Sequence, residues 1–205
     1  MLIDALRKGH QKRRPRTRGK DRRGGIRNMR SIRERPEEAQ SRKVPGHWEG
    51  DLIKGAFNGS AIGTLVDRST RFVILAKVDG ASAEAVLEGF SRRLRTLPKA
   101  LRKTLTYDQG REMARHKELE NRTHLMVYFA DPHSPWQRPT NENTNGLLRQ
   151  HFPKGTDLSQ HSQQYLTKVA HEMNNRPRKS LGFRIPDEAM TQKIKDLNSS
   201  VALQN

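Results

Sequence analysis

Residues 46–78 read GHWEGDLIKGAFNGSAIGTLVDRSTRFVILAKV, and this stretch decides the fold. It holds three short β-rich segments, at about 47–54, 60–67 and 71–78. Turn residues separate them, with Asn58-Gly59 in the first gap and Asp67-Arg68-Ser69-Thr70 in the second. Because connections this short join neighbouring strands as hairpins, the stretch predicts three antiparallel strands.

The chain that follows this stretch alternates helices and strands. Apolar residues recur at helical spacing over 83–94, and Ser82 is placed to cap that helix. The further expected elements are a strand at 105–108, a helix at 111–121, a strand at 125–130, and helices at about 139–151 and 161–175. The order β-β-β-α-β-α-β-α-α predicts an α/β fold, with one mixed five-stranded sheet flanked by helices.

The chain that precedes this stretch is a polycation. Residues 1–43 hold 16 Lys and Arg against 5 Asp and Glu, within a whole-chain net charge of +18. They lack apolar periodicity, so we expect a basic, largely disordered arm at 1–43, one folded domain at 44–195 and a C-terminal tail at 196–205. Phosphate is the natural counter-charge, which indicates a nucleic-acid partner. The alternative is a solvated tail that helps solubility or binds RNA nonspecifically.

Composition excludes several classes of protein and site. The chain has no cysteine, which rules out disulfides and thiolate metal sites. Its densest apolar run, 72–76, is far too short to cross a bilayer, so no membrane partner is expected. There is no P-loop and no dinucleotide fingerprint, and Asn175 stands where a zinc-protease helix beginning at His171 would need its second histidine. A reducing cytoplasm fits this composition.

Three acidic residues lie within or beside predicted strands and helices, at positions where an unpaired carboxylate would be unfavourable. Asp51 lies within the first strand, Asp108 closes the fourth, and Glu142 lies early in the helix after the fifth. Desolvated carboxylates that converge repel one another unless a divalent cation intervenes, and oxygen ligands suit Mg²⁺ or Mn²⁺. Each also has an ordinary explanation: a solvent-facing strand position for Asp51, a turn or cap for Asp108, and the positive end of a helix for Glu142. Glu49, on the same strand face as Asp51, is the substitute candidate.

Three blocks of this sequence resemble the insertion sequence 30 family of transposases. They are Gly46–Ile53, Thr104–Gly110 and a long third block with FADPHSPWQR at 129–138 and NENTNGLLRQ at 141–150, which continues through 152–158 and 174–178. The resemblance covers about residues 22–190, and the 33 residues between Asp108 and Glu142 are the spacing typical of this family. It implies an RNase H-like DDE catalytic domain at 44–195, with Asp51, Asp108 and Glu142 as catalytic, metal-binding residues.

The same resemblance implies a DNA transposase core. Two Mg²⁺ (or Mn²⁺) ions would straddle a scissile phosphate, one activating water or a DNA 3′-OH and the other stabilising the leaving oxygen. Asp51 would bridge both ions, while Asp108 and Glu142 would each complete one site. The implied reaction is cleavage at transposon ends and strand transfer into target DNA, by a homo-oligomer on DNA at the cytoplasmic nucleoid.

Basic residues in and after the third block are candidates for contacts with DNA phosphate. Arg149 shares the helical face of Glu142 and Asn145. The other candidates are Lys154, Arg176, Arg178 and Lys179. Each of these has an ordinary solvated charge or ion pair as its alternative. Trp136, in the loop before the Glu142 helix, is expected to anchor that loop on the core, with stacking on a DNA base as the alternative.

Two departures from the family pattern bear on function. Pro139 stands where the family usually has glycine, which is favourable if Pro139 is the first helical residue and harmful if the helix begins earlier. Family members carry an N-terminal helix-turn-helix region before the basic stretch, and this chain is expected to lack it. The alternative function is therefore a catalytically silent fragment that binds DNA nonspecifically or inhibits a full-length partner.

Overall fold

The computed structural model describes residues 25–202. The elements are α1 (Glu37–Ser41), β1 (His47–Lys54), β2 (Ala61–Asp67), β3 (Val73–Val78), α2 (Ala83–Leu94), β4 (Thr104–Tyr107), α3 (His116–Thr123), β5 (Met126–Phe129), α4 (Pro139–Leu148), α5 (Gln163–Asn174) and α6 (Pro186–Ala202). One short 3-10 turn, at 32–34, precedes α1, and others at 56–58, 99–101, 111–113, 135–137 and 179–181 lie between the later elements. Helix α2 has the predicted bounds, and the Ser82 hydroxyl accepts a hydrogen bond from the Ala85 amide as predicted.

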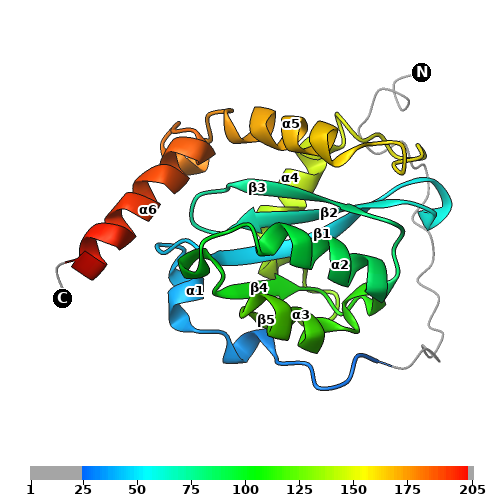
Figure 1. The fold of residues 1–205 in the computed structure, drawn as a ribbon, viewed down its shortest axis with the longest axis horizontal. Coiled ribbons are helices and arrows are strands. Elements are labelled where there is room, and N and C mark those ends of the chain that lie inside the picture. The colour runs from blue at the N-terminus through cyan, green and yellow to red at the C-terminus, as the bar shows by residue number, and fades with distance from the viewer. Residues whose placement is uncertain (1–24, 203–205) are drawn as a thin grey trace.

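The five strands form one mixed sheet in the order β3-β2-β1-β4-β5 (Figure 1). Strands β1, β2 and β3 pair antiparallel, whereas β4 pairs parallel to β1 and β5 parallel to β4. The predicted α/β fold with a mixed five-stranded sheet is confirmed. Because β1 is the central strand, it has a neighbouring strand on each edge, and its side chains pack on both faces of the sheet.

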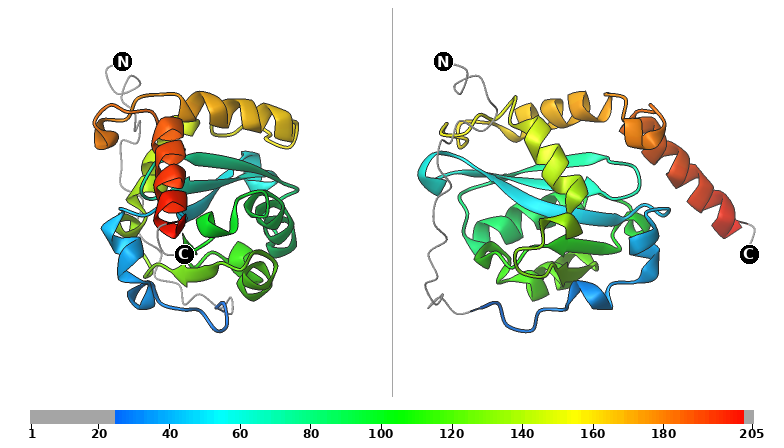
Figure 2. Two further views of the ribbon diagram at one scale, coloured as in Figure 1. Left: turned by 60° about the vertical axis from the view of Figure 1, so that its left-hand side comes forward. Right: turned by 180° about the vertical axis from the view of Figure 1, so that it is seen from behind.

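Helices cover both faces of this sheet (Figure 2). On one face α2 and α3 pack against a cluster that includes Trp48, Leu65 and Phe90. On the other face α4 and α5 pack against a cluster that includes Ile53 and Val66. Since successive strand residues point to opposite faces, neighbours such as Leu65 and Val66 belong to different clusters. Helix α4 therefore lies directly over β1 and β2.

Several predicted helix ends differ from the structure. The helix expected at 111–121 is a 3-10 turn at 111–113 followed by α3, with Arg115 outside helical geometry between them. The helices expected at 139–151 and 161–175 are shorter, at 139–148 and 163–174. Apolar spacing reports which face is buried, but it does not report where the backbone hydrogen bonds begin and end.

The segment before β1 is ordered where the structure describes it. The Phe129 amide donates to the carbonyl of Arg30, and Ser31 forms a parallel bridge with Phe129 beside β5. Ile32 and Ala39 are buried. The expectation of an extended arm is therefore wrong for residues 25–43, because isolated apolar residues there pack on the sheet without any periodic pattern. Residues 1–24 lie outside the described residues.

The C-terminal helix also departs from the expected domain boundary. Helix α6 runs from Pro186 to Ala202 without a break at residue 195. Ile194 and Leu197 pack against the core cluster beneath α2, so both sides of the expected boundary contact the same core. In residues 25–202, no helix combines the length and apolar character required to cross a membrane.

Candidate active site

The three carboxylates come from elements that meet at one place. Asp51 lies on β1, Asp108 directly follows β4, and Glu142 is the fourth residue of α4. Glu49 pairs with Thr106 in the parallel register of β1 and β4, so Asp51 and Asp108 stand at the same level. A cavity of about 150 Å³ is lined by Asp51, Glu142, Pro135 and Arg138. Asp108 lines an adjoining cavity that also includes Pro135 and Arg138.

Asp51 is tied to both β1 and α4. One carboxylate oxygen accepts a hydrogen bond from the Leu52 amide, and the other accepts one from the Asn145 side chain, each at 2.9 Å. Burial raises the pKa of Asp51 above its usual range, and the charges of Asp108 and Glu112 raise it further. The guanidinium of Arg138 and the Leu52 hydrogen bond oppose this pKa shift. Asp51 thus has partners that orient it but do not fully compensate its charge.

Arg138 lies between the two aspartates. One guanidinium nitrogen donates to Asp108 at 3.3 Å. The other donates to the Gly50 carbonyl at 2.9 Å and lies 4.0 Å from Asp51. A positive charge is favourable here because two carboxylates converge. The sequence did not single out Arg138, because nothing in its local pattern shows that the loop before α4 carries it into the space between β1 and β4.

Asp108 also shapes its own turn. Its Oδ1 accepts a hydrogen bond from the Gly110 amide at 2.9 Å, so the ordinary turn role is present as well. A side chain on Gly110 would meet both Asp108 and Glu112, which shows how tightly this turn brings the two acids together. The turn therefore fixes the direction of the Asp108 carboxylate.

Glu112 is a fourth acid at the cluster that sequence reasoning missed. Its side chain is only 11% exposed and lies 3.6 Å from the Lys54 ammonium. Its charge acts on Asp51 and on the buried Tyr107 hydroxyl, whose pKa burial raises well above the usual value. The helix that the sequence predicted from residue 111 did not indicate that Glu112 lies beside Asp108. The tight 3-10 turn at 111–113 puts it there.

Glu142 is exposed and faces the cavity beside Asp51. Pro139 is the first residue of α4, the position where proline is favourable. In the described part of the chain, no three His, Cys, Asp or Glu side chains form a ready-made metal site. The three acids line adjoining cavities and do not form a closed set of ligands.

Glu49, the substitute candidate, has a different environment. It is fully buried and forms an ion pair with Arg68 at 2.5 Å. Its second carboxylate oxygen accepts the backbone amide of Asn141, and its carbonyl accepts the Asn141 side chain, each at 2.9 Å. Burial lowers the pKa of Arg68 to about 10, which leaves the side chain cationic at neutral pH. Glu49 therefore holds α4 on β1 and does not line the cavity.

The predicted DNA-contact residues fall in different settings. Arg149 donates to the carbonyls of Lys54 and Phe152, so its guanidinium ties α4 to the end of β1. Lys154, Arg176 and Lys179 are exposed. Arg178 is half-buried and donates to the Met173 carbonyl at 2.8 Å.

Trp136 does not anchor its loop on the core, and that expectation is wrong. Its side chain is 69% exposed. Gln137 holds the loop in its place, since its side chain accepts from the Asp131 amide and donates to the Asp131 carboxylate. The loop satisfies its polar groups locally and leaves the indole ring outside.

Comparison with known proteins identifies related sequences and one related fold. The profile of the integrase core domain family matches residues 41–135. The chain is 55% identical to the transposase for insertion sequence element IS1086 of Cupriavidus metallidurans, over 99% of this chain and 60% of that protein. It is 48% identical to transposase InsI for insertion sequence element IS30A of Escherichia coli, over 80% of this chain and 42% of that protein. It thus spans between about two fifths and three fifths of these two relatives.

A solved structure shares the fold. A chain in the cryoEM structure of the simian T-cell lymphotropic virus intasome in complex with PP2A regulatory subunit B56 gamma superposes with a TM-score of 0.51. The two chains are 16% identical, and the match covers 64% of this chain and 49% of that one. At this identity the match bears on architecture alone. Together with the sheet topology, it confirms the RNase H-like fold.

Proposed function

We propose that this chain is the catalytic core of a DNA transposase. Residues 41–135 match the integrase core domain family, and the chain is homologous over most of its length to transposases of the insertion sequence 30 family. The proposed reaction is metal-dependent hydrolysis of a phosphodiester at a transposon end, followed by attack of the freed 3′-OH on target DNA. The proposed partners are these two DNAs and further copies of the chain, at the nucleoid of the cell.

One observation carries this proposal. Asp51, Asp108 and Glu142, which are far apart in sequence, meet at two adjoining cavities, with the guanidinium of Arg138 between the two aspartates. Structural carboxylates are normally paired and satisfied, as Glu49 is. A cluster of incompletely compensated acids in a cavity is typical of a functional site.

The donor set fits Mg²⁺ or Mn²⁺. The three proposed ligands offer only carboxylate oxygens, and Arg138 already occupies a point where the cluster favours positive charge. When bound, such ions would stabilise charge on the phosphate and on the attacking and leaving oxygens. Asp51, Asp108 and Glu142 would hold them.

The protein's own contribution is to orient these ligands. Asn145 holds the Asp51 carboxylate, and the Gly110 amide holds that of Asp108. The Glu49–Asn141 contacts fix the first turn of α4 and so the position of Glu142. Partners of this kind keep a site near its working geometry.

A strand-nicking assay tests the proposal. The chain is incubated with supercoiled plasmid in Mn²⁺, alongside Glu142→Gln and a matched control, Glu172→Gln, which alters an exposed acid on α5. We expect nicking by the wild type and the control, and background levels from Glu142→Gln, because only that variant removes a proposed ligand.

Two results would contradict the proposal. Equal nicking by Glu142→Gln and the wild type would exclude the proposed ligand set. Absence of nicking in all three proteins, with DNA binding retained, would favour the alternative of a catalytically silent DNA-binding protein.

A further inference from the structure

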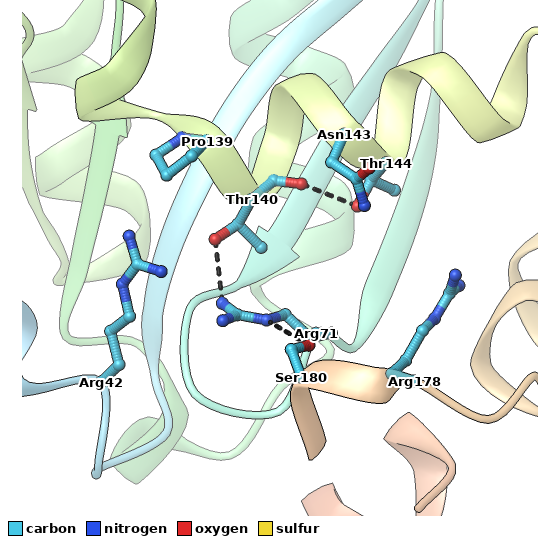
Figure 3. Close-up of a pocket in the computed structure, with 8 residues that line it drawn as sticks. All are labelled: Arg42, Arg71, Pro139, Thr140, Asn143, Thr144, Arg178 and Ser180. Carbon is cyan, nitrogen blue, oxygen red and sulfur yellow. Dashed lines mark hydrogen bonds between the residues drawn. The ribbon is translucent and has the colours of Figure 1, made fainter. Parts of the chain in front are cut away.

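A third cavity lies on the opposite side of the first turn of α4 from the two cavities at the acids. It has a volume of about 180 Å³ and is lined by Arg42, Arg71 and Arg178 together with polar residues of α4. Figure 3 shows the three arginines on three separate segments, with Arg42 and Arg71 pointing toward the start of α4. No acid is among the described residues that line it. Three cations with no lining carboxylate create a positive potential that favours an anionic ligand.

Two of these arginines are held in place by the fold. Arg71 donates to the Thr140 hydroxyl of α4 at 2.9 Å and to the Ser180 hydroxyl at 3.4 Å. Arg178 donates through one terminal nitrogen to the Met173 carbonyl, while its buried Nε has no hydrogen-bond partner within the described residues. The two side chains therefore present cationic groups at the cavity with little freedom to move away.

Arg42 supplies the third charge and is the least committed of the three. It ends α1, in a left-handed backbone conformation with φ of 55°. Among residues 25–202 its guanidinium has no hydrogen-bond or ion-pair partner. Burial and the charge of Arg42 lower the pKa of Arg71, while the charges of Glu49 and Asp67, which do not line this cavity, oppose that shift. The guanidinium groups of Arg42 and Arg71 therefore repel each other. An anion placed between them would relieve that repulsion.

Basic surface continues on both sides of this cavity. Arg42 also lines a cavity with Arg33, Arg35 and the exposed Trp136. Arg178 also lines one with Lys179 and Asn143, the residue after Glu142. A polyanion lying along this track would pass the first turn of α4, which carries Glu142 on its other side.

We propose that Arg42, Arg71 and Arg178 form a subsite for a backbone phosphate of the DNA whose scissile phosphate lies at the acids. This inference rests on the proposed function in taking DNA as the ligand. Guanidinium groups bind phosphate oxygens through paired N–H donors, and three positive charges with no lining acid favour an anionic phosphodiester over a neutral base. The subsite would set the position of the strand and would read no sequence.

The test measures DNA binding without metal. Anisotropy of a fluorescein-labelled DNA duplex is followed in EDTA over a series of NaCl concentrations for the wild type and Arg42→Gln. Losing one phosphate contact reduces the slope of log K against log salt by about 0.9 and weakens binding roughly five- to tenfold near 0.1 M salt. We expect both changes, and Arg42→Lys should restore most of the slope because it keeps the charge.

Arg92→Gln is the matched control. Arg92 is exposed on α2, on the opposite face of the sheet, and its replacement makes the same change in net charge. Equal effects of Arg42→Gln and Arg92→Gln on the salt slope and on the affinity for the duplex would overturn the subsite. A thermal unfolding curve confirms that each variant is folded, and Arg178→Gln provides a second variant of the same cavity.

The result of this DNA-binding test does not depend on whether the chain cleaves DNA. If the wild type binds DNA and Arg42→Gln binds equally well, only the subsite fails, whatever the nicking assay shows. If the wild type does not bind DNA at all, the proposed function fails with it. Glu142→Gln should bind the duplex at least as tightly as the wild type, since it removes a negative charge near the phosphate track.

Discussion

Glu49 and Asp51 lie two residues apart on the same face of β1, yet their surroundings differ in kind. Glu49 is fully buried and completely paired, by the guanidinium of Arg68 and the amide of Asn141. Asp51 is half-buried, faces two further acids and has an arginine 4.0 Å away. We therefore expect Glu49 to stabilise the fold and the ionised Asp51 carboxylate to lower its stability. The difference shows how adjacent positions on one strand divide between structure and proposed chemistry.

Replacing Glu49 should have the largest effect on stability. Glu49→Ala leaves Arg68 buried without its carboxylate and frees the first turn of α4, so we expect the free energy of unfolding to fall by about 3–5 kcal/mol. Urea denaturation measures this, with the exposed Glu172→Ala as control. A loss no larger than that of the control would show that the buried pair contributes little.

Two asparagines of α4, Asn141 and Asn145, separate the two roles more finely. Asn141→Ala removes buried hydrogen bonds to Glu49 and Thr64, and should lower the free energy of unfolding by about 1–3 kcal/mol. Asn145→Ala removes a half-buried hydrogen bond to Asp51, so we expect the free energy of unfolding to fall by less than about 1 kcal/mol. Because Asn145 orients a proposed ligand, the same variant should reduce nicking roughly 10- to 100-fold. Unfolding and nicking assays on both variants test this. The same ratio of the two effects in both variants would contradict the division of roles.

Asp51→Asn should stabilise the metal-free chain while abolishing nicking. Burial and neighbouring acids disfavour the ionised Asp51 carboxylate, so a neutral side chain of the same shape relieves that cost. The expected gain is about 0.5–2 kcal/mol, the range usual for relieving a strained functional position. Thermal unfolding in EDTA measures it. A clear decrease in stability would mean that Arg138 compensates the Asp51 charge fully.

The pH dependence of this gain is the smallest expected effect. A carboxyl whose pKa is raised by folding contributes stability below its unfolded pKa, near 3.8, and loses that contribution as pH rises through its folded pKa. The stability advantage of Asp51→Asn over the wild type should therefore grow from pH 3.8 upward and level off once Asp51 is ionised. Unfolding in EDTA at several pH values checks this, and a difference independent of pH would contradict it.

The sequence determined the order of elements and the mixed sheet, because alternating apolar residues and turn residues act locally. Hairpins at 47–78 and the helix at 83–94 follow from such local rules. The sequence also singled out Asp51, Asp108 and Glu142, whose shared location the structure now gives. Their role as metal ligands stays a prediction.

Only the tertiary structure decided which neighbours these residues have. Apart from the family resemblance, nothing in the local pattern distinguishes Glu49 from Asp51, and nothing in it shows that Arg138 and Glu112 lie beside the acids. The segment before β1 looked like a featureless basic arm, yet it packs beside β5 and carries Arg42 to the first turn of α4. Charge compensation depends on distances between segments that are remote in sequence, and those distances exist only once the sheet and its helices have packed.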